Sequence, residues 1–226
     1  INEDGTPDFI VDKVDQVTFG LAALNLYEFF GDNKYKNTAD VLYEFIRKLA
    51  LENENEIIEY RENQSAYLVD TLGLVCPFLL RYGDLFNDKY ASGLAERQIN
   101  YYVRNGIDND TFLPYHSINK TLNIKLGPTN WGRGLGWYAL AVASAKTHIQ
   151  IEDDVNSKLD GFINTILKLE NSELVYTQFP GQESSFDASA SLMIMYSLKV
   201  INENYLRKAD FTDKFSKFVR DGKVIS

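Results

Sequence analysis

The 226-residue sequence is poor in the residues from which disulfides and metal centres are built, with one cysteine and two histidines. Because Cys76 is the only cysteine, an intrachain disulfide and a cysteine-built zinc site are both excluded. Two histidines, His116 and His148, are too few for a histidine-rich metal site. We therefore expect neither a metal nor a cofactor.

The sequence also lacks long apolar runs and an excess of positive charge. No run reaches the roughly 18 apolar residues of a membrane-spanning segment, so a membrane is not an expected partner. Lys and Arg total 23 against 32 Asp and Glu, a net charge of −9, which argues against nucleic acid as the main partner. We expect no signal peptide, and a first residue of Ile1 leaves the compartment open between cytoplasm and periplasm.

Aromatic residues, by contrast, are abundant: 14 Tyr, 14 Phe and 2 Trp make up 13% of the chain. Phe and Tyr fill protein cores, and aromatic side chains in clefts also stack on sugars. Composition alone leaves both interpretations open.

Helical periodicity dominates the chain, because apolar residues recur at i, i+3 and i+4 through most of it. It predicts about eight helices, near residues 9–31, 34–51, 67–82, 89–104, 131–147, 153–168, 187–206 and 212–220. Little sheet is expected: a β-hairpin around Phe112–Tyr115 and Thr121–Lys125, and a short strand or loop at Leu174–Phe179.

An internal repeat links the first two pairs of predicted helices. Tyr35 and Tyr90, each in an Asn/Asp-rich turn, are 55 residues apart, as are Asp15 and Asp70. Helix pairs that repeat at roughly this period indicate a stack or ring of αα-hairpins. We therefore predict an all-α, toroid-like single domain over residues 1–226.

In such a ring, the first helices of successive pairs begin at the same mouth. Asp15, Asp70, Arg133 and Asp187 each lie near the start of such a helix. A solvated surface explains any one of these charges well, but it explains their recurrence at equivalent positions less well.

Asp70 is the only charged residue in an otherwise apolar helical segment, from Val69 to Leu80. A carboxylate in such a run is seldom fully buried unless it is paired or functional. The alternative is a helix cap or a first-turn residue favoured by the helix dipole. Asp15 has the same two interpretations, with the surface explanation made easier by Asp12 beside it.

The most distinctive stretch is Trp131-Gly132-Arg133-Gly134-Leu135-Gly136-Trp137. Arg133 and Trp137 are four residues apart and share a helix face. Trp137 is suited to stacking on a sugar and Arg133 to binding a carboxylate. The alternative is tight helix packing around a Trp–Arg cation–π pair.

Two other features carry weaker signals. His116 lies in the loop before that stretch, where a lone histidine is more often a surface residue than a catalyst. Small and polar residues lead into the helix after Asp187, which suits either a helix cap or the lining of a ligand cavity.

Together, these motifs resemble the unsaturated glycuronyl hydrolases. The resemblance covers roughly residues 10–205 and is carried by the order of Val69-Asp70, Leu72-Gly73, Pro77-Phe78-Leu79, His116, the Trp131–Trp137 stretch and Asp187-x-Ser189-Ala190-Ser191. The Trp-Gly-Arg-Gly-x-Gly-Trp form is most similar to glycoside hydrolase family 105, the unsaturated rhamnogalacturonyl hydrolases, and family 88 is its near relative.

The resemblance implies an (α/α)6 toroid and an oligosaccharide substrate left by a polysaccharide lyase. It implies hydration of the C4=C5 double bond of a terminal unsaturated uronic acid, of rhamnogalacturonan type, with release of the rest of the chain. It assigns Asp70 as general acid/base and Asp15 as the second aspartate. It assigns His116, Arg133, Trp137 and Trp131 as substrate-binding residues.

About eight helices are fewer than the twelve of a complete ring, so an incomplete ring is expected. Its exposed inner helices favour homo-oligomers. Two further hypotheses stay open: a non-catalytic toroid that binds a polysaccharide or helps to synthesise it, and an α-solenoid interaction module.

Overall fold

The computed structural model describes residues 1–226 except 62–64, 170–175, 206–215, 217–218, 222 and 225–226. The described α-helices are α1 (Thr18–Phe30), α2 (Asn33–Leu51), α3 (Val69–Phe86), α4 (Lys89–Asn105), α5 (Gly132–His148), α6 (Asp153–Leu169) and α7 (Ala188–Ile201). Three short 3-10 helices are η1 (Val14–Val17), η2 (Glu54–Glu56) and η3 (Glu203–Tyr205). The strands are β1 (Ala66–Leu68), β2 (Ser117–Asn119), β3 (Lys125–Leu126), β4 (Val219–Arg220) and β5 (Lys223–Val224).

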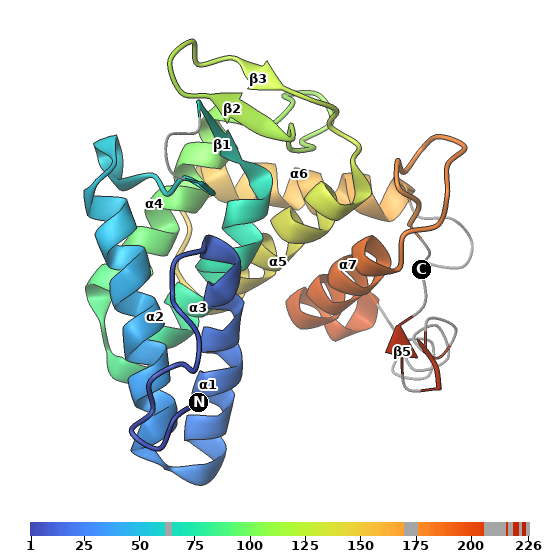
Figure 1. Cartoon of the computed structure of the whole chain (residues 1–226). Helices are drawn as coiled ribbons and strands as arrows, with labels where there is room; N and C mark the ends of the chain where they lie inside the picture. The colour runs from blue at the N-terminus through green and yellow to red at the C-terminus, as the bar shows by residue number, and fades with distance from the viewer. Residues whose placement is uncertain (62–64, 170–175, 206–215, 217–218, 222, 225–226) are drawn as a thin grey trace.

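The helices form an arc of hairpins (Figure 1). Along the arc α1 contacts α3, α3 contacts α5 and α5 contacts α7, while α2 packs on α1 and α4 packs on α3. The prediction of an all-α, toroid-like fold is confirmed. That residues 1–226 form a single domain stays a prediction.

The turns inside the first two hairpins are built in the same way, as the internal repeat predicts. Each helix ends at a residue in the left-handed conformation, Gly31 after α1 and Asn87 after α3. The next residue is an aspartate that caps the following helix: Asp32 accepts from the Lys34 amide, and Asp88 from the amides of Tyr90 and Ala91. A left-handed residue followed by an N-cap reverses the chain within two residues and satisfies the exposed amides.

Three predicted helix boundaries are wrong. The helix predicted over 187–206 ends at Ile201, and η3 follows it. α3 continues to Phe86, beyond the predicted end at Tyr82, because Gly83 does not terminate it. A Cβ on Gly83 would lie 2.1 Å from Ser92 Oγ, so the glycine permits the close crossing of α3 and α4. The first predicted helix begins at Thr18 rather than near Phe9, with η1 before it.

The predicted β-hairpin exists but is shifted along the chain. β2 and β3 pair Ser117 with Leu126, whereas Pro114 only forms an isolated bridge with Ile107. A third strand, β1, joins this antiparallel sheet in the order β1-β2-β3. The sequence placed Ala66–Leu68 next to or inside a helix and gave no sign of this pairing.

The end of the chain is described only in part. The predicted helix over 212–220 lies mostly outside the described residues, and Val219 and Arg220 belong to β4. The predicted strand or loop at Leu174–Phe179 falls partly outside them as well, and Thr177 there bridges Phe186. Among the described residues, no helix combines the length and apolarity needed to cross a membrane.

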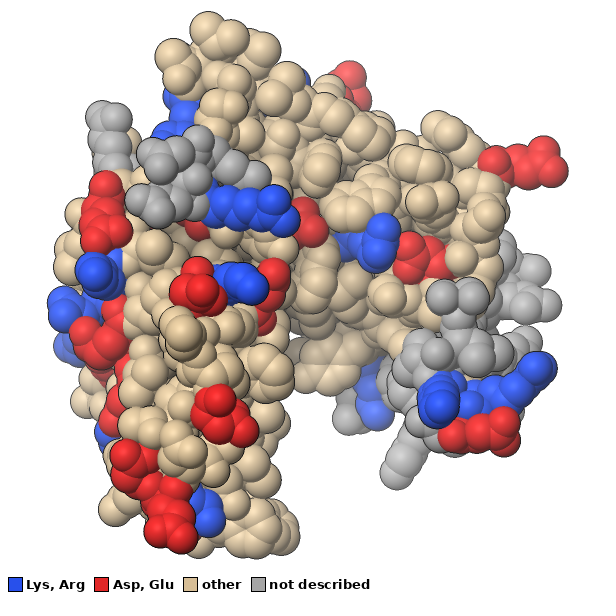
Figure 2. Space-filling view, viewed as in Figure 1, with Lys and Arg blue, Asp and Glu red and all other residues tan. Residues whose placement is uncertain are grey.

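The two end helices of the arc expose large apolar side chains, as an incomplete ring predicts. Phe19 and Phe29 are exposed on α1, and Tyr196 and Val200 on α7. Figure 2 shows a notch in the molecular surface between the hairpin of α1 and α2 and the end of the arc that carries α7. Association into homo-oligomers stays a prediction.

Candidate active site

Strand pairing brings Asp70 and His116 together, although they are far apart in sequence. Asp70 is the second residue of α3, which follows β1 directly. β1 pairs Leu68 with Ser117 of β2, and the Val69 amide donates to the His116 carbonyl at 3.0 Å. The side chains then face each other, with 3.7 Å between His116 Nε2 and Asp70 Oδ2.

Asp70 is not a helix cap, but it lies in the first turn of α3, as the other structural alternative expected. The N-cap position of α3 is Leu68, and no side chain caps this helix. The Asp70 side chain is 18% exposed, and its Oδ2 has no hydrogen-bond partner among the described residues. A buried carboxylate oxygen without a hydrogen bond is costly, and the helix dipole at the first turn offsets part of that cost.

Burial raises the pKa of the Asp70 carboxyl above its ordinary value, because desolvation penalises the charged form. The positive charges of His116 and Arg133 act against this shift, and the negative charge of Asp15 adds to it. The predicted site residues His116, Arg133 and Asp15 therefore all act on the charge of Asp70.

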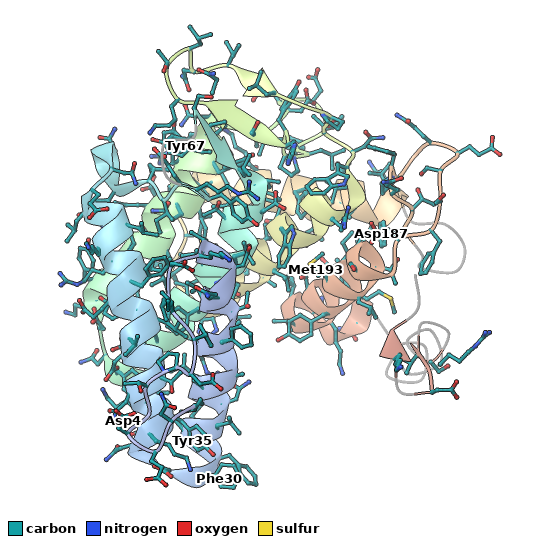
Figure 3. All side chains as sticks on the ribbon, in the orientation of Figure 1. Asp4, Phe30, Tyr35, Tyr67, Asp187 and Met193 are labelled. Atoms are coloured by element: carbon teal, nitrogen blue, oxygen red, sulfur yellow. The ribbon has the colours of Figure 1, made fainter. Side chains whose placement is uncertain are left out.

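Trp131 connects His116 to the start of α5. The His116 and Trp131 rings meet edge to face, with centroids 4.7 Å apart. The Arg133 guanidinium lies over the Trp131 ring at 5.4 Å, and its Nε is 3.6 Å from Asp187 Oδ2. Asp187 also caps α7 by accepting from the Ala190 amide at 2.9 Å, as one sequence interpretation expected. Figure 3 shows Asp187 at this helix start.

The glycines of the Trp131–Trp137 stretch are explained by packing. A Cβ on Gly132 would meet the Thr177 carbonyl oxygen at 2.4 Å, and one on Gly136 would meet Met193 of α7 at 2.7 Å. Figure 3 places Met193 on α7 where that helix faces α5. The alternative of tight helix packing therefore accounts for these glycines.

Trp137 is held against α3 by a further glycine. A Cβ on Gly73 would lie 2.5 Å from the Trp137 carbonyl oxygen and 2.8 Å from its ring atom Cε3. Gly73 is three residues after Asp70 and thus near it on the helix face. Trp137 is half-buried and packs against the core.

Asp15 lies in a separate cleft. It is exposed on η1 and lines a cleft of about 1000 Å³ together with Tyr60, Arg61, Glu59 and other residues. A hydrogen bond to Asp15 is the main cause that raises the pKa of the Tyr60 hydroxyl. Tyr60, Arg61 and Glu59 lie in a polar stretch without a recognisable motif, so their sequence did not mark them as lining a cleft.

The predicted residues therefore do not share one closed cavity. The large cleft includes Asp15, and a smaller hollow of about 280 Å³ includes Arg133 and Asp187. Asp70 lines neither of these two hollows, but it interacts electrostatically with both Asp15 and Arg133. No cluster of metal-binding side chains occurs in the described part of the chain.

The fold is of the helical-toroid class, and acids, cations and tryptophans lie at the starts of its helices. The chain belongs to Glycosyl Hydrolase Family 88, whose family model matches residues 1–220.

Individual relatives agree with this. The chain is 27% identical over 218 residues to the unsaturated rhamnogalacturonyl hydrolase YesR of Bacillus subtilis (strain 168), covering 91% of this chain and 62% of that relative. A family 105 glycoside hydrolase of C. acetobutylicum ATCC 824 has a similar structure, with a TM-score of 0.74 and 22% identity over 96% of this chain and 66% of its own. A family 88 glycosyl hydrolase of Bacteroides vulgatus has a TM-score of 0.63 and 15% identity over 99% and 69%.

Proposed function

We propose that this protein hydrates the C4=C5 double bond of an unsaturated uronic acid at the end of an oligosaccharide, with Asp70 as general acid/base. The observation that carries the proposal is the state of Asp70: a largely buried carboxyl that faces His116, whose Oδ2 has no hydrogen-bond partner among the described residues and whose pKa is raised. A raised pKa keeps more of the group protonated at a given pH, as a proton donor requires.

The chemistry is that of a vinyl ether. The Asp70 proton adds to C4, and the positive charge that develops at C5 is shared with the ring oxygen. Water then adds to C5 while the Asp70 carboxylate accepts its proton, which restores the acid. The resulting hemiketal opens to a ketone, and the former ring carbon C1 releases the remaining sugar chain as an alcohol.

The neighbours of Asp70 have distinct roles in this proposal. Asp15 helps to position the substrate, and its charge supports the raised pKa of Asp70. Arg133 and His116 bind the uronate carboxylate, which is attached to C5 and so lies close to the reacting carbon. Trp131 and Trp137 supply apolar surfaces for the sugar ring.

The substrate class follows from the chemistry and from similarity. The similarity to the Bacillus subtilis hydrolase supports an oligosaccharide of rhamnogalacturonan type. This chain spans 62% of the length of that relative.

A spectroscopic assay tests the proposal. The double bond is conjugated with the carboxylate, so its ultraviolet absorbance disappears on hydration. We expect this loss when the protein is mixed with lyase-generated rhamnogalacturonan disaccharide. Binding of the disaccharide without loss of absorbance contradicts the proposal.

A further inference from the structure

We infer that Tyr102 of α4 is a positioning residue for the proposed reaction, because its hydroxyl fixes the peptide before His116 and so directs the His116 ring toward Asp70. The inference rests on the proposed function and extends it to a residue behind the site. Tyr102 is only 2% exposed, so it acts through His116 and not by contact with the substrate.

The Tyr102 hydroxyl is bonded directly to the loop that carries His116. It donates a hydrogen bond to the Tyr115 carbonyl at 2.7 Å. The Tyr115 amide donates to the Gly106 carbonyl at 2.8 Å, and the Gly106 amide donates to the Tyr102 carbonyl at 2.7 Å. These three hydrogen bonds join the end of α4 to the residue that precedes His116, and so they anchor that residue.

This anchor matters for His116 because of main-chain geometry. Peptide groups are planar, so fixing the planes on both sides of a residue fixes its φ and ψ and the direction of its side chain. The plane before His116 contains the Tyr115 carbonyl, which Tyr102 holds. The plane after it contains the His116 carbonyl, which accepts from the Val69 amide at 3.0 Å. With both planes held, the side chain points toward Asp70.

The contacts of the His116 side chain do not by themselves hold it in place. At 3.7 Å, its Nε2 is too far from Asp70 Oδ2 for a hydrogen bond. The contact with the Trp131 ring is apolar, with centroids 4.7 Å apart. A Cβ on Gly127 would lie 2.7 Å from the His116 Cβ, so the chain passes close by on that side without bonding to the ring. The main-chain restraints therefore carry the positioning.

The Tyr102 hydroxyl is a donor throughout the pH range in which Asp70 titrates. Burial raises the pKa of Tyr102 well above its ordinary value, and the negative charge of Asp70 adds to this shift. The hydroxyl therefore stays protonated, and its hydrogen bond to the Tyr115 carbonyl does not change when Asp70 gains or loses a proton.

The neighbouring Tyr101 provides a matched control on the same helix. Its ring packs edge to face against Tyr67, with centroids 5.4 Å apart. Its hydroxyl forms no hydrogen bond with another described residue, and burial alone raises its pKa. Tyr101→Phe thus removes a hydroxyl from α4 without releasing the loop, whereas Tyr102→Phe removes the hydroxyl that holds it. Phenylalanine keeps the ring in the core in both variants.

NMR of the histidine and tryptophan rings tests the inference without any substrate. The chain has only two residues of each type, so the signals are readily assigned. In the wild type we expect a nuclear Overhauser contact between the rings of His116 and Trp131. Tyr102→Phe should weaken this contact and shift the His116 signals, while those of His148 stay unchanged. Tyr101→Phe should change neither. An unchanged His116–Trp131 contact in Tyr102→Phe overturns the inference.

Kinetics with lyase-generated rhamnogalacturonan disaccharide give the second test. Tyr102→Phe should lower kcat/KM about tenfold, since misplacing a group in the site from a distance is costly. The positive charge of His116 lowers the pKa of Asp70, so releasing His116 should also move the high-pH limb of kcat to higher pH. Loss of stability alone would not move this limb. Wild-type kinetics in Tyr102→Phe overturn the inference.

A double-mutant cycle shows whether Tyr102 acts through His116. His116→Ala alone and the double variant with Tyr102→Phe should have the same kcat/KM, because the hydroxyl has no side chain left to position. If the two losses add, Tyr102 affects the rate by another route, and the inference is overturned.

Failure of the proposed function gives a different result. If the wild-type protein does not hydrate the unsaturated disaccharide, the proposed reaction is wrong. The NMR comparison still decides whether Tyr102 orients His116. A weakened His116–Trp131 contact in Tyr102→Phe but not in Tyr101→Phe supports this role, and equal contacts in the two variants contradict it.

Discussion

The two aspartates of the internal repeat lie at equivalent helix starts but in opposite environments. Asp70 is largely buried between packed helices, next to His116 and close to Arg133. Asp15 is exposed in an open, charged cleft that Tyr60 also lines. Burial raises the pKa of Asp70. The same residue type at the same repeat position thus has two environments, which fit the proposed roles of Asp70 as acid and of Asp15 as a positioning group.

The largest expected effect is that of replacing Asp70. Asp70→Asn removes the proton donor and should lower kcat at least about a hundredfold in the absorbance assay, since general acid–base groups contribute roughly 10²–10⁴-fold. Asp15→Asn is the matched variant at the other helix start, and we expect it to lose about tenfold. Equal losses of kcat in Asp70→Asn and Asp15→Asn would contradict the proposal that Asp70 is the acid and Asp15 a positioning group.

The stability of Asp70→Asn gives the control for folding. Because the pKa of Asp70 is raised in the folded state, its carboxyl favours folding below the unfolded-state pKa, and this contribution is lost as pH rises through the folded-state value. At neutral pH the asparagine variant should be at least as stable as the wild type in thermal unfolding. A large drop in Tm would mean that the kinetic loss reflects misfolding.

A second prediction concerns the packing beneath Asp70. Gly73→Ala forces a Cβ to within 2.5 Å of Trp137 backbone, and it should lower the free energy of unfolding by about 1–3 kcal/mol. Gly93→Ala is the matched helical control, because its Cβ would meet only Arg97 Nη1, at 3.5 Å. It should be neutral or stabilising by up to about 1 kcal/mol. Denaturant unfolding measures the free energy of unfolding of both variants. Similar changes in Gly73→Ala and Gly93→Ala would contradict the close packing of Trp137 on Gly73.

The smallest expected effect is a pair of opposite shifts in the pH profile. Asp15→Asn removes a charge that raises the pKa of Asp70, so the fall in kcat at high pH should move to lower pH. Arg133→Gln removes a charge that lowers this pKa, so the same limb should move to higher pH. Profiles of kcat under saturating substrate measure both shifts, and movement in the same direction would show that Asp70 is not the titrating group.

The repeated parts of the fold are the parts that the sequence predicted well. The Gly31-Asp32 turn follows local rules and a 3.6-residue apolar period marks the packed helices, whereas the end of α3 was predicted four residues too early, at Tyr82. The burial of Asp70 was signalled by its position as the only charge in an apolar run.

What the sequence did not predict depends on contacts between distant segments. The pairing of β1 with β2, which sets His116 against Asp70, involves only three residues on each strand. No local motif marks Tyr60 and Arg61, and only the fold places them in the same cleft as Asp15. The glycines of the Trp131–Trp137 stretch were visible, but only the structure shows that Gly132 and Gly136 fit against Thr177 and Met193.

The most direct test of the account is the titration of the Asp70 carboxyl itself, followed by carbon NMR of aspartate-labelled protein and assigned with Asp70→Asn. The account predicts that Asp70 titrates above the ordinary aspartate pKa and that this value matches the high-pH limb of kcat/KM, which reports the free enzyme. The account would be contradicted if Asp70 titrated at or below the ordinary aspartate pKa. It would also be contradicted if kcat/KM fell at high pH around a pKa other than that of Asp70.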